Sequence, residues 1–363
     1  MQQPKVSVLI SFYNLAPYVD QTMESVLAQK TDFPVEILCA DDGSDDGTVE
    51  KLHNWCSRCP DTIRMFIMER KPGLKVDNRG RIQRLNAIRS RLLEEARGEY
   101  ICYLDGDDFY TDPNKLQKQA DILDADKEHV YVACGHNGCY YWESTGETRP
   151  IEKPIRECGL TAKEYWSFLY VHTNAMMFRN LRQQGIDPYA SRVTIDDNML
   201  TAQFLPYGGV YYLPDCMFNY RQTEGSTFHL RSQYQNFMLN ALMVYEQGRV
   251  AKGFWGASLV RTIYEYQQLY AHRKDLQLAE EAAIFLEHFR SFGAGRLCRL
   301  VNYSQESLPL RLWCEVENKF WFFMTRIFSP LYLETESTGS AGGGPHQTAA
   351  DLRRHRAVSG MRA

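Results

Sequence analysis

The segment GEYICYLDGDD, residues 98–108, runs from a strand pattern directly into a group of carboxylates. Tyr100 to Leu104 is apolar and aromatic, as in a buried strand, and Asp105-Gly106-Asp107-Asp108 follows at once; these four residues are called the acidic cluster below. In an extended segment Asp105 and Asp107, at i and i+2, project from the same side. Gly106 between them is expected to let the backbone approach a ligand.

Hard oxygen ligands of this kind suit Mg²⁺ or Mn²⁺, which usually also binds substrate phosphates. The acidic cluster therefore predicts a divalent metal site. An acidic turn that opens the helix after Pro113 is the alternative, and it stays open at this point.

Strand and helix patterns alternate through the first third of the chain. The expected strands are 6–10, 35–40, 63–68 and 100–104, and the expected helices are 18–29, 48–56 and 80–97. This alternation predicts a parallel sheet with helices on both faces. Ligands of such sheets bind beyond the carboxyl ends of the strands, and the acidic cluster lies at such an end.

A second acidic group, Asp41-Asp42-Gly43-Ser44-Asp45-Asp46, follows the second strand. Ser44, Asp45 or Asp46 could cap the helix that begins near Thr48. Capping accounts for one acid, whereas four acids and two glycines in seven residues indicate a ligand. We interpret this loop as a nucleotide pocket in which a carboxylate accepts a hydrogen bond from a base N–H.

The sequence pattern changes twice in the rest of the chain. Mixed strands and helices from about 130 to 225 are expected to complete the sheet, and residues 232 to 330 have a helical pattern. The last thirty residues are rich in Gly, Ser, Ala and Arg and are expected to be disordered. The predicted domains are thus 1–228, a helical region 229–333 and a tail 334–363.

Composition excludes some classes of function. A net charge of −4 argues against nucleic-acid binding. The sequence shows neither a signal peptide nor an apolar run long enough to span a membrane, so a cytoplasmic location is expected. The aromatic stretch from Phe320 to Leu333 either packs against the helical region or lies in a membrane interface, which would place the protein on the inner face of the membrane.

The ten cysteines are expected to remain reduced, in keeping with the intracellular features of the chain. Cys39 and Cys102 lie within apolar strand patterns and are expected to be small core residues. The cysteines lack the paired spacing of a zinc knuckle, so structural zinc is not predicted.

Five motifs in order make the chain resemble the family-2 glycosyltransferases from about residue 5 to 226. They are Val6–Asn14, Asp41–Ser44 with Asp46–Thr48, Arg89 before Gly98–Asp108, Ile195–Leu200, and Tyr220–Arg221 with Glu224–Ser226. The chain departs from the family pattern where Ser11 replaces a proline, Ser90 an asparagine and Thr223 a histidine that is a potential third metal ligand. The resemblance implies the GT-A fold, a Rossmann-like, mostly parallel α/β sheet flanked by helices, here with a C-terminal helical appendage.

The resemblance also implies roles for the donor-binding residues. Asp42 would bind the base, expected to be uracil, and Asp41 would support the base or ribose. Tyr13 and Arg89 would belong to the same nucleotide-sugar site. Arg221 would reach the diphosphate, although an ordinary surface salt bridge is equally compatible with the sequence.

The remaining implied roles concern the reaction. Asp107 would be the principal ligand of Mn²⁺ or Mg²⁺, and Asp105 and Asp108 would hold the ribose, the metal waters or the metal. Asp197 would be the general base of an inverting displacement. The implied reaction moves a sugar from a nucleotide-diphosphate sugar to a hydroxyl of a glycan or lipid-linked acceptor, as in surface polysaccharide or lipopolysaccharide synthesis.

Other functions fit less well. Phe109 stands where an aspartyl phosphatase needs a small β-branched residue, and no Gly-x-Gly-x-x-Gly follows the first strand as in nicotinamide enzymes. A non-catalytic nucleotide-sugar-binding or scaffold protein of the same fold is the alternative. His172 and His229 lack metal-ligand spacing, and the aromatic run Tyr140–Trp142 either stacks on a sugar ring or packs within the sheet.

Overall fold

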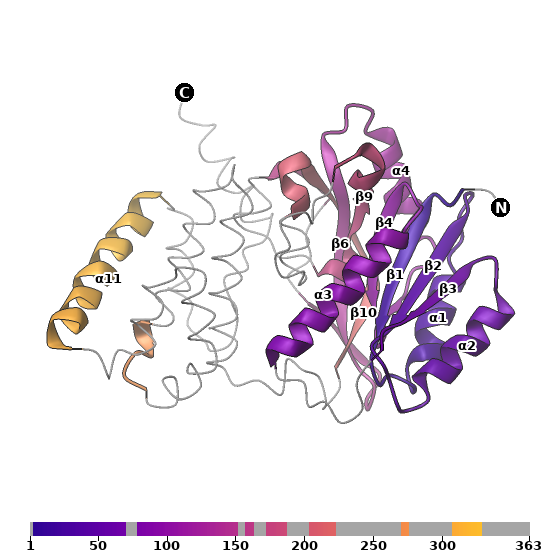
Figure 1. Ribbon diagram of the computed structural model, residues 1–363. Helices are drawn as coiled ribbons and strands as arrows, with labels where there is room; N and C mark the ends of the chain where they lie inside the picture. The colour runs from indigo at the N-terminus through magenta and orange to yellow at the C-terminus, as the bar shows by residue number, and fades with distance from the viewer. Residues whose placement is uncertain are drawn as a thin grey trace. The chain divides into compact units, whose positions relative to one another are not determined.

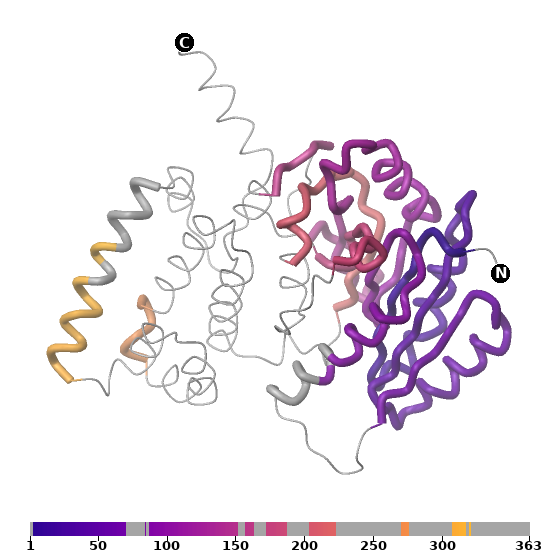
Figure 2. Tube along the Cα trace, turned by 45° about the horizontal axis from the view of Figure 1, so that its top comes forward, coloured from indigo at the N-terminus to yellow at the C-terminus, as the bar shows by residue number. Residues whose placement is uncertain are grey.

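The computed structural model describes residues 3–69, 78–151, 157–162, 172–186, 203–222, 270–275 and 307–328. These ranges are the coloured parts of the ribbon in Figure 1, and Figure 2 shows the same chain as a tube. The chain divides into two units, Met1–Thr223 with His346–Ala363 and Glu224–Pro345. Each unit is described separately below.

The described strands of the first unit form one sheet in the order β3-β2-β1-β4-β9-β6-β10-β5, with β7 paired to β6 and β8 paired to β10. The strands are β1 (Val6–Phe12), β2 (Val35–Asp41), β3 (Ile63–Ile67), β4 (Tyr100–Asp105), β5 (Phe109–Tyr110), β6 (Tyr131–Trp142), β7 (Glu147–Pro150), β8 (Cys158–Leu160), β9 (Met177–Arg179) and β10 (Gly209–Gln222). β1 to β4 are parallel, and β6 is parallel to β10. β9 runs antiparallel between β4 and β6. The expected mostly parallel sheet is confirmed.

The helices between these strands are α1 (Val19–Leu27), α2 (Thr48–Arg58), α3 (Asn78–Glu95) and α4 (Lys115–Ala125). Each expected strand and helix of the first third is present, with ends that shift by a few residues. The sequence predicts these helices correctly because apolar side chains recur at helical spacing, as at Val19, Met23 and Val26 of α1.

The two faces of the sheet carry different helices. Cys39 of β2 contacts Met23 of α1 through sulfur atoms 3.7 Å apart, which identifies the α1 face. Leu104 is in register with Cys39 through β1, so its neighbour Asp105 points to the opposite face. α3 packs there, across β1 and β2, and it lies in front of the sheet in Figure 1.

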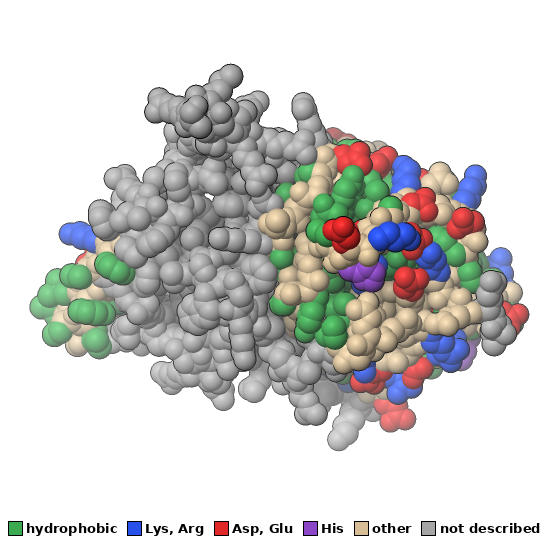
Figure 3. Space-filling model, turned by 90° about the horizontal axis from the view of Figure 1, so that it is seen from above, with side chains coloured by type: hydrophobic (Ala, Val, Ile, Leu, Met, Phe, Trp, Pro, Cys, Tyr) green, Lys and Arg blue, Asp and Glu red, His purple; other side chains and the backbone are tan. Residues whose placement is uncertain are grey.

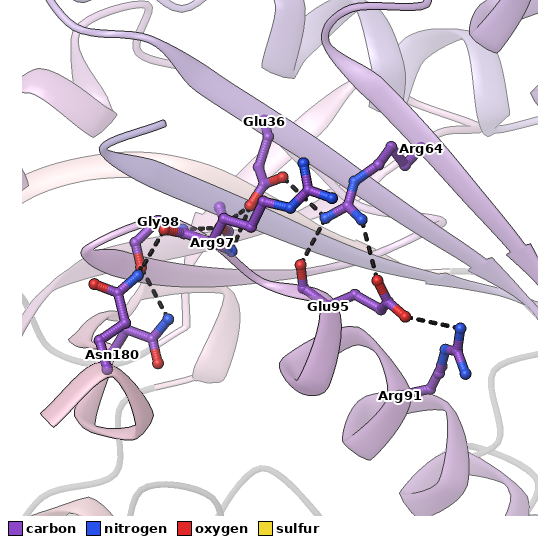
Figure 4. A network of polar contacts seen from close by, with 9 residues as sticks. Glu36, Arg64, Arg91, Glu95, Arg97, Gly98 and Asn180 are labelled. Atoms are coloured by element: carbon purple, nitrogen blue, oxygen red, sulfur yellow. Dashed lines mark hydrogen bonds and ion pairs between the residues drawn. The ribbon is translucent and has the colours of Figure 1, made fainter. Parts of the chain in front are cut away.

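A polar network holds the C-terminal end of α3 at the edge of the sheet opposite the acidic cluster (Figure 4). Glu36 accepts hydrogen bonds from the Ser7 hydroxyl at 2.6 Å and the Arg97 N–H at 2.7 Å. Arg64 bridges Glu36 to Glu95 of α3, with 3.1 Å to each carboxylate. Because α3 is fixed at this end, its preceding turns reach the carboxyl edge of the sheet in a defined position.

Gly98 belongs to the same corner, between α3 and β4. A Cβ atom on Gly98 would lie 2.5 Å from the Ser7 nitrogen, so a larger residue cannot follow this path. Its carbonyl accepts hydrogen bonds from the side chains of Asn180 and Gln183, at 2.9 Å each. The glycine that opens the sequence motif is therefore explained by packing.

The cysteine expectation needs one correction. The structure pairs Cys139 of β6 with Cys216 of β10 in a disulfide, so the expectation that all ten cysteines are reduced is wrong. The two strands run side by side here, and an irregularity in β10 next to Cys216 brings the sulfur atoms together. Cys39 and Cys102 are buried free thiols, as expected for small core residues.

In the second unit the described residues are 270–275 and helix α11 (Leu308–Phe328). The polar side of α11 faces the chain, since Glu315 pairs with Tyr270 and with Arg273, the latter at 2.9 Å. Five of its exposed side chains are apolar, namely Leu308, Leu312, Trp313, Val316 and Phe320, and hydrophobic side chains gather at this end of Figure 3; Lys319 is exposed as well. None of the helices in the described ranges has the length and hydropathy of a membrane span.

Within the aromatic stretch, Phe320 is 51% exposed. The helix presents its charged side inward because Glu315 meets Tyr270 and Arg273 there. The side chains of Trp321, Phe322, Phe323, Met324 and Phe328 lie outside the description, as do the expected helix 276–290 and the tail.

Candidate active site

The acidic cluster is a tight turn at the carboxyl end of β4. The strand ends at Asp105, and the Asp108 N–H donates to the Asp105 carbonyl at 3.0 Å, which closes the turn. The prediction of an extended segment is therefore wrong, and Asp105 and Asp107 do not share a side through strand alternation. The turn forms because the Gly106 N–H bonds the Ser11 carbonyl of β1, at 3.0 Å.

Gly106 is required by packing in this turn. A Cβ atom at this position would lie 2.3 Å from the Phe12 ring and 2.7 Å from the Ser11 carbonyl. The Thr22 hydroxyl of α1 lies 2.9 Å from the Gly106 carbonyl and 2.8 Å from that of Asp108. The turn is thus pressed against β1 and tied to α1, which fixes its backbone.

Two of the three carboxylates are held by protein donors. Asp108 is fully buried and accepts hydrogen bonds from the Arg221 N–H at 2.9 Å and the Asn174 amide at 2.6 Å. Burial and the charges of the other two acids raise its pKa well above the ordinary value. Asp105 lies 3.5 Å from the guanidinium of Arg89 and 3.4 Å from the Asn174 amide.

Asp107 differs, because no hydrogen bond or ion pair joins its carboxylate to another side chain of the described chain. Burial, and then the charge of Asp105, raise its pKa to about 6. No group of three or more His, Cys, Asp or Glu side chains arranged to hold a metal occurs in the described ranges. Mg²⁺ and Mn²⁺ are nonetheless commonly bound by one or two carboxylates together with phosphates and water, so Asp107 beside Asp105 fits such an ion.

Arg221 of β10 holds the turn from the side. It is 2% exposed, and its Nε donates to the Asp107 carbonyl at 2.8 Å. Its Nη atoms reach Glu143, at 2.9 Å, and Gln21, and the guanidinium lies 4.6 Å from the Tyr18 ring centroid. The salt bridge considered from the sequence is present, with Glu143, but the arginine itself is buried among the residues that position the acidic cluster.

The second acidic loop separates Asp41 from Asp42. Asp41 is fully buried, and its carboxylate accepts from the N–H groups of Gly43 and Ser44 at 2.8 Å and from the Ser44 hydroxyl at 2.5 Å. Gly43 has a φ of 76°, as the expected sharp turn requires. Asp41 therefore shapes the loop. The N-cap position of α2 is Gly47, and Asp46 just before it accepts from the Thr48 N–H at 3.0 Å.

Asp42 is engaged by an arginine that the sequence did not single out. Arg84 of α3 places Nε 2.6 Å and Nη2 2.5 Å from Asp42 Oδ1. Arg84 lies five residues before Arg89, on a helix that was already expected to carry one arginine to the site. This proximity in the sequence could have identified Arg84. Tyr13, after β1, is 43% exposed near this loop, where the Asn14 N–H bonds the Ser44 hydroxyl at 2.8 Å.

Residues 7–185, about half of the chain, match the model of the family described as glycosyl transferase family 2. The match includes both acidic loops and α3. The chain belongs to glycosyl transferase family 2. The resemblance found in the sequence is thereby confirmed, and with it the GT-A-like α/β fold.

The similarity of this family-2 chain to curated relatives covers more residues than the segment 7–185. The uncharacterized protein Mb1547 of Mycobacterium bovis is 27% identical over 62% of this chain and 60% of its own length. EpsE of Bacillus subtilis, named a glycosyltransferase, is 28% identical over 69% of this chain and 84% of that protein. TuaG of Bacillus subtilis, named for teichuronic acid biosynthesis, is 31% identical over 34% of this chain and 44% of that protein. The chain thus spans 60% of the length of the first mycobacterial relatives that it matches.

Several predicted features of this family-2 chain lie outside the described residues. They are the general base Asp197 with its motif 195–200, Thr223, residues 224–226 and His229. The described residues do add Asn174, in the 3-10 turn η1 (Thr173–Ala175), which donates to both Asp105 and Asp108. Sequence reasoning missed Asn174, because nothing in its local pattern marks it.

Proposed function

We propose that the protein transfers a sugar from a nucleotide-diphosphate sugar, with UDP as the expected nucleotide, to a hydroxyl of a glycan or lipid-linked acceptor. One observation carries the proposal: in this family-2 chain, Asp107 presents a carboxylate without a side-chain partner among the described residues, while its neighbours Asp105 and Asp108 are held by protein donors. An acid kept in this way next to other acids is neutralised by a proton or by a cation, and a divalent cation would serve here.

Asp107, with Asp105 beside it, would hold Mn²⁺ or Mg²⁺. When bound, the ion neutralises the diphosphate as it leaves the sugar. Arg221 supports this role because it fixes the Asp107 carbonyl at 2.8 Å and so limits the positions that the carboxylate can take. Asp108 would act within the protein, joining β10 and η1 to the turn through 2.9 and 2.6 Å hydrogen bonds.

Asp42 would accept a hydrogen bond from the base, with Arg84 positioning its carboxylate. Asp41 would shape the loop, Tyr13 would border the nucleotide, and Arg89 would orient Asp105. These assignments are supported by the placement of both acidic loops at the carboxyl edges of β2 and β4, which are the neighbours of β1 in the sheet.

Asp197 would take the proton of the acceptor hydroxyl as its oxygen attacks the anomeric carbon, in a single displacement that inverts the anomeric centre. The support for this step comes from the sequence motif alone. Asp197→Asn is expected to retain donor binding and to lose transfer, and retained turnover would remove Asp197 from this role.

The biological setting that we propose is surface polysaccharide or lipopolysaccharide synthesis, which is an inference by analogy with relatives such as TuaG. A cytoplasmic protein bound at the inner face of the membrane would fit a lipid-linked acceptor. The outward apolar side of α11, with Leu308 and Trp313 at 63% and 57% exposure, supports membrane association. Sedimentation with phospholipid vesicles tests it: Trp313→Glu should reduce the bound fraction, and a second copy on this face would instead appear as a dimer in light scattering.

Titration calorimetry with UDP tests the metal site and the donor together. We expect measurable affinity with Mn²⁺, a large loss in EDTA, and the same loss in Asp107→Asn with Mn²⁺. Asp121→Asn is the matched control, since Asp121 is an exposed acid on α4 that bonds only Gln117, at 2.8 Å, among the described residues. Equal affinity in EDTA would refute the metal role of Asp107.

A thermal-shift screen of UDP-, GDP- and dTDP-sugars should identify the donor, because a bound ligand raises the midpoint of unfolding. Release of the nucleotide from the stabilising donor then separates an enzyme from a scaffold. Binding without any turnover, in the presence of acceptor glycans, would favour the non-catalytic alternative.

A further inference from the structure

Four aromatic side chains meet at the carboxyl ends of β6 and β10. Tyr140 and Trp142 alternate with Tyr141 along β6, and Tyr220 of β10 is in register with Tyr140. Ring centroids are 6.0 Å apart for Tyr140 and Trp142 and 5.9 Å apart for Tyr140 and Tyr220. His172, just before η1, lies 4.9 Å from Tyr220. Tyr140, Trp142, His172 and Tyr220 are called the aromatic platform below; all four are half-buried.

The strands beneath are shaped to carry these rings. Phe218, fully buried, lies 5.4 Å from His172 and forms the base of the group. Its ring crosses β6 at Gly138, where a Cβ atom would come within 2.0 Å of it. Gly138 therefore allows Phe218 to lie flat under the platform, and any larger residue would displace the rings above.

The aromatic platform adjoins the acidic cluster through η1. The His172 Nδ1 accepts the Asn174 N–H at 3.3 Å, and the Asn174 amide donates to Asp108 at 2.6 Å. Strand alternation turns Arg221 to the opposite side of β10 from Tyr220, and there it holds the Asp107 carbonyl. The platform thus lies on one side of β10, and the arginine that holds the Asp107 carbonyl lies on the other.

We propose that the aromatic platform binds a pyranose ring of the acceptor glycan. Each of its members joins an aromatic face to a polar atom, namely a hydroxyl, an indole N–H or an imidazole nitrogen. A pyranose has the matching character, since C–H groups cover its faces and hydroxyls surround its edge. A lipid tail would instead suit a surface of Leu, Val and Phe, such as the exposed side of α11.

The position also suits an acceptor better than a donor. In a displacement with inversion the attacking oxygen approaches the anomeric carbon from the side opposite to the leaving diphosphate. Arg221, which holds the Asp107 carbonyl, lies on the other side of β10 from Tyr220, so we place the diphosphate on the Arg221 side and the acceptor ring on the Tyr220 side. This inference rests on the proposed glycosyl transfer and adds a subsite to it.

The test uses the full chain on an array of pyranose oligosaccharides, with UDP and Mn²⁺ present. Wild-type protein should bind at least one glycan, and Trp142→Ala and Tyr220→Ala should each weaken that binding about tenfold or more, as central aromatic contacts do. Trp142→Phe keeps an aromatic face and should retain most of the binding.

Tyr211→Ala is the matched control. Tyr211 lies in the same strand β10, half-buried against Tyr131 at 5.4 Å, but near the other end of the strand. It should lose little glycan binding. Thermal unfolding and UDP calorimetry on each variant show whether the fold and the donor site are intact.

The proposal is overturned if the wild-type chain binds UDP but no glycan on the array. It is equally overturned if Trp142→Ala and Tyr220→Ala bind glycans as the wild type does. Failure of UDP binding in the wild type would instead contradict the proposed function itself, so the two failures can be told apart.

Discussion

Replacing Arg221 with methionine should destabilise the protein and displace the turn that carries Asp107. The methionine keeps an apolar stem but removes every guanidinium contact. Glu143 is 53% exposed and Gln21 is also exposed, so water replaces the arginine at both and little free energy is lost there. The Asp107 carbonyl loses a hydrogen bond to a charged group, worth about 1.5–3 kcal/mol. The contact with the Tyr18 ring adds about 0.5–1 kcal/mol, so the free energy of unfolding should fall by roughly 2–4 kcal/mol.

Urea unfolding followed by circular dichroism measures this change, and UDP calorimetry with Mn²⁺ measures its effect on the site. Arg91→Met is the control, because Arg91 also pairs with a carboxylate, at 2.7 Å, and lies 5.2 Å from the Phe66 ring, but its side chain is 48% exposed. It should change stability by under about 1 kcal/mol and leave UDP affinity unchanged. Equal midpoints for the Arg221 and Arg91 variants, with unchanged UDP affinity in both, would refute the positioning role of Arg221.

Three further changes have defined outcomes. Gly106→Ala should lower the free energy of unfolding by about 1–3 kcal/mol, since its Cβ would lie 2.3 Å from Phe12, and Phe12→Leu in the same chain should recover part of the loss in urea unfolding. Arg84→Leu should weaken UDP binding in calorimetry to nearly the same extent as Asp42→Ala, and additive losses in the double variant would show that the pair does not act together. Burial, and then the charge of Lys115, lower the pKa of His136 well below 6.5, so its contribution to stability is fully present above pH 6.5 and is lost as the pH falls below it. Urea midpoints from pH 7.5 to 5 should therefore fall less steeply in His136→Gln than in the wild type, and parallel curves would contradict this.

The sequence was informative about the first unit because its elements are local. β1 to β4 carry short apolar runs, and α1 repeats its apolar side chains at Val19, Met23 and Val26, so propensity, burial and alternation all agree. The same reasoning could not find the ladder of β6 and β10, because their pairing joins residues about eighty positions apart and contains register shifts. Such pairings are set by packing between distant segments, which no local pattern contains.

The candidate site shows the same division between local and distant causes. The residue types at 105–108 and at 41–42 could be read directly, and both groups lie where strand ends were expected. The extended geometry of Asp105 to Asp107 could not be foreseen, because the turn depends on the Ser11 carbonyl of a neighbouring strand. Arg84 was missed for a related reason: an arginine on a helix acquires its meaning only when the packing of α3 brings it to Asp42.

The three acids of the cluster are equivalent in the sequence motif and different in the structure, and the difference originates far along the chain. Asp108 is committed to the protein because β10 supplies the Arg221 N–H and η1 supplies the Asn174 amide. Asp105 is shared between α3 and η1 through contacts of 3.5 and 3.4 Å. Asp107 alone has a carboxylate with no hydrogen bond or ion pair to another described side chain, and Arg221 hydrogen-bonds its carbonyl. The surrounding elements therefore use two acids to build the turn and leave the third for the cation that we propose.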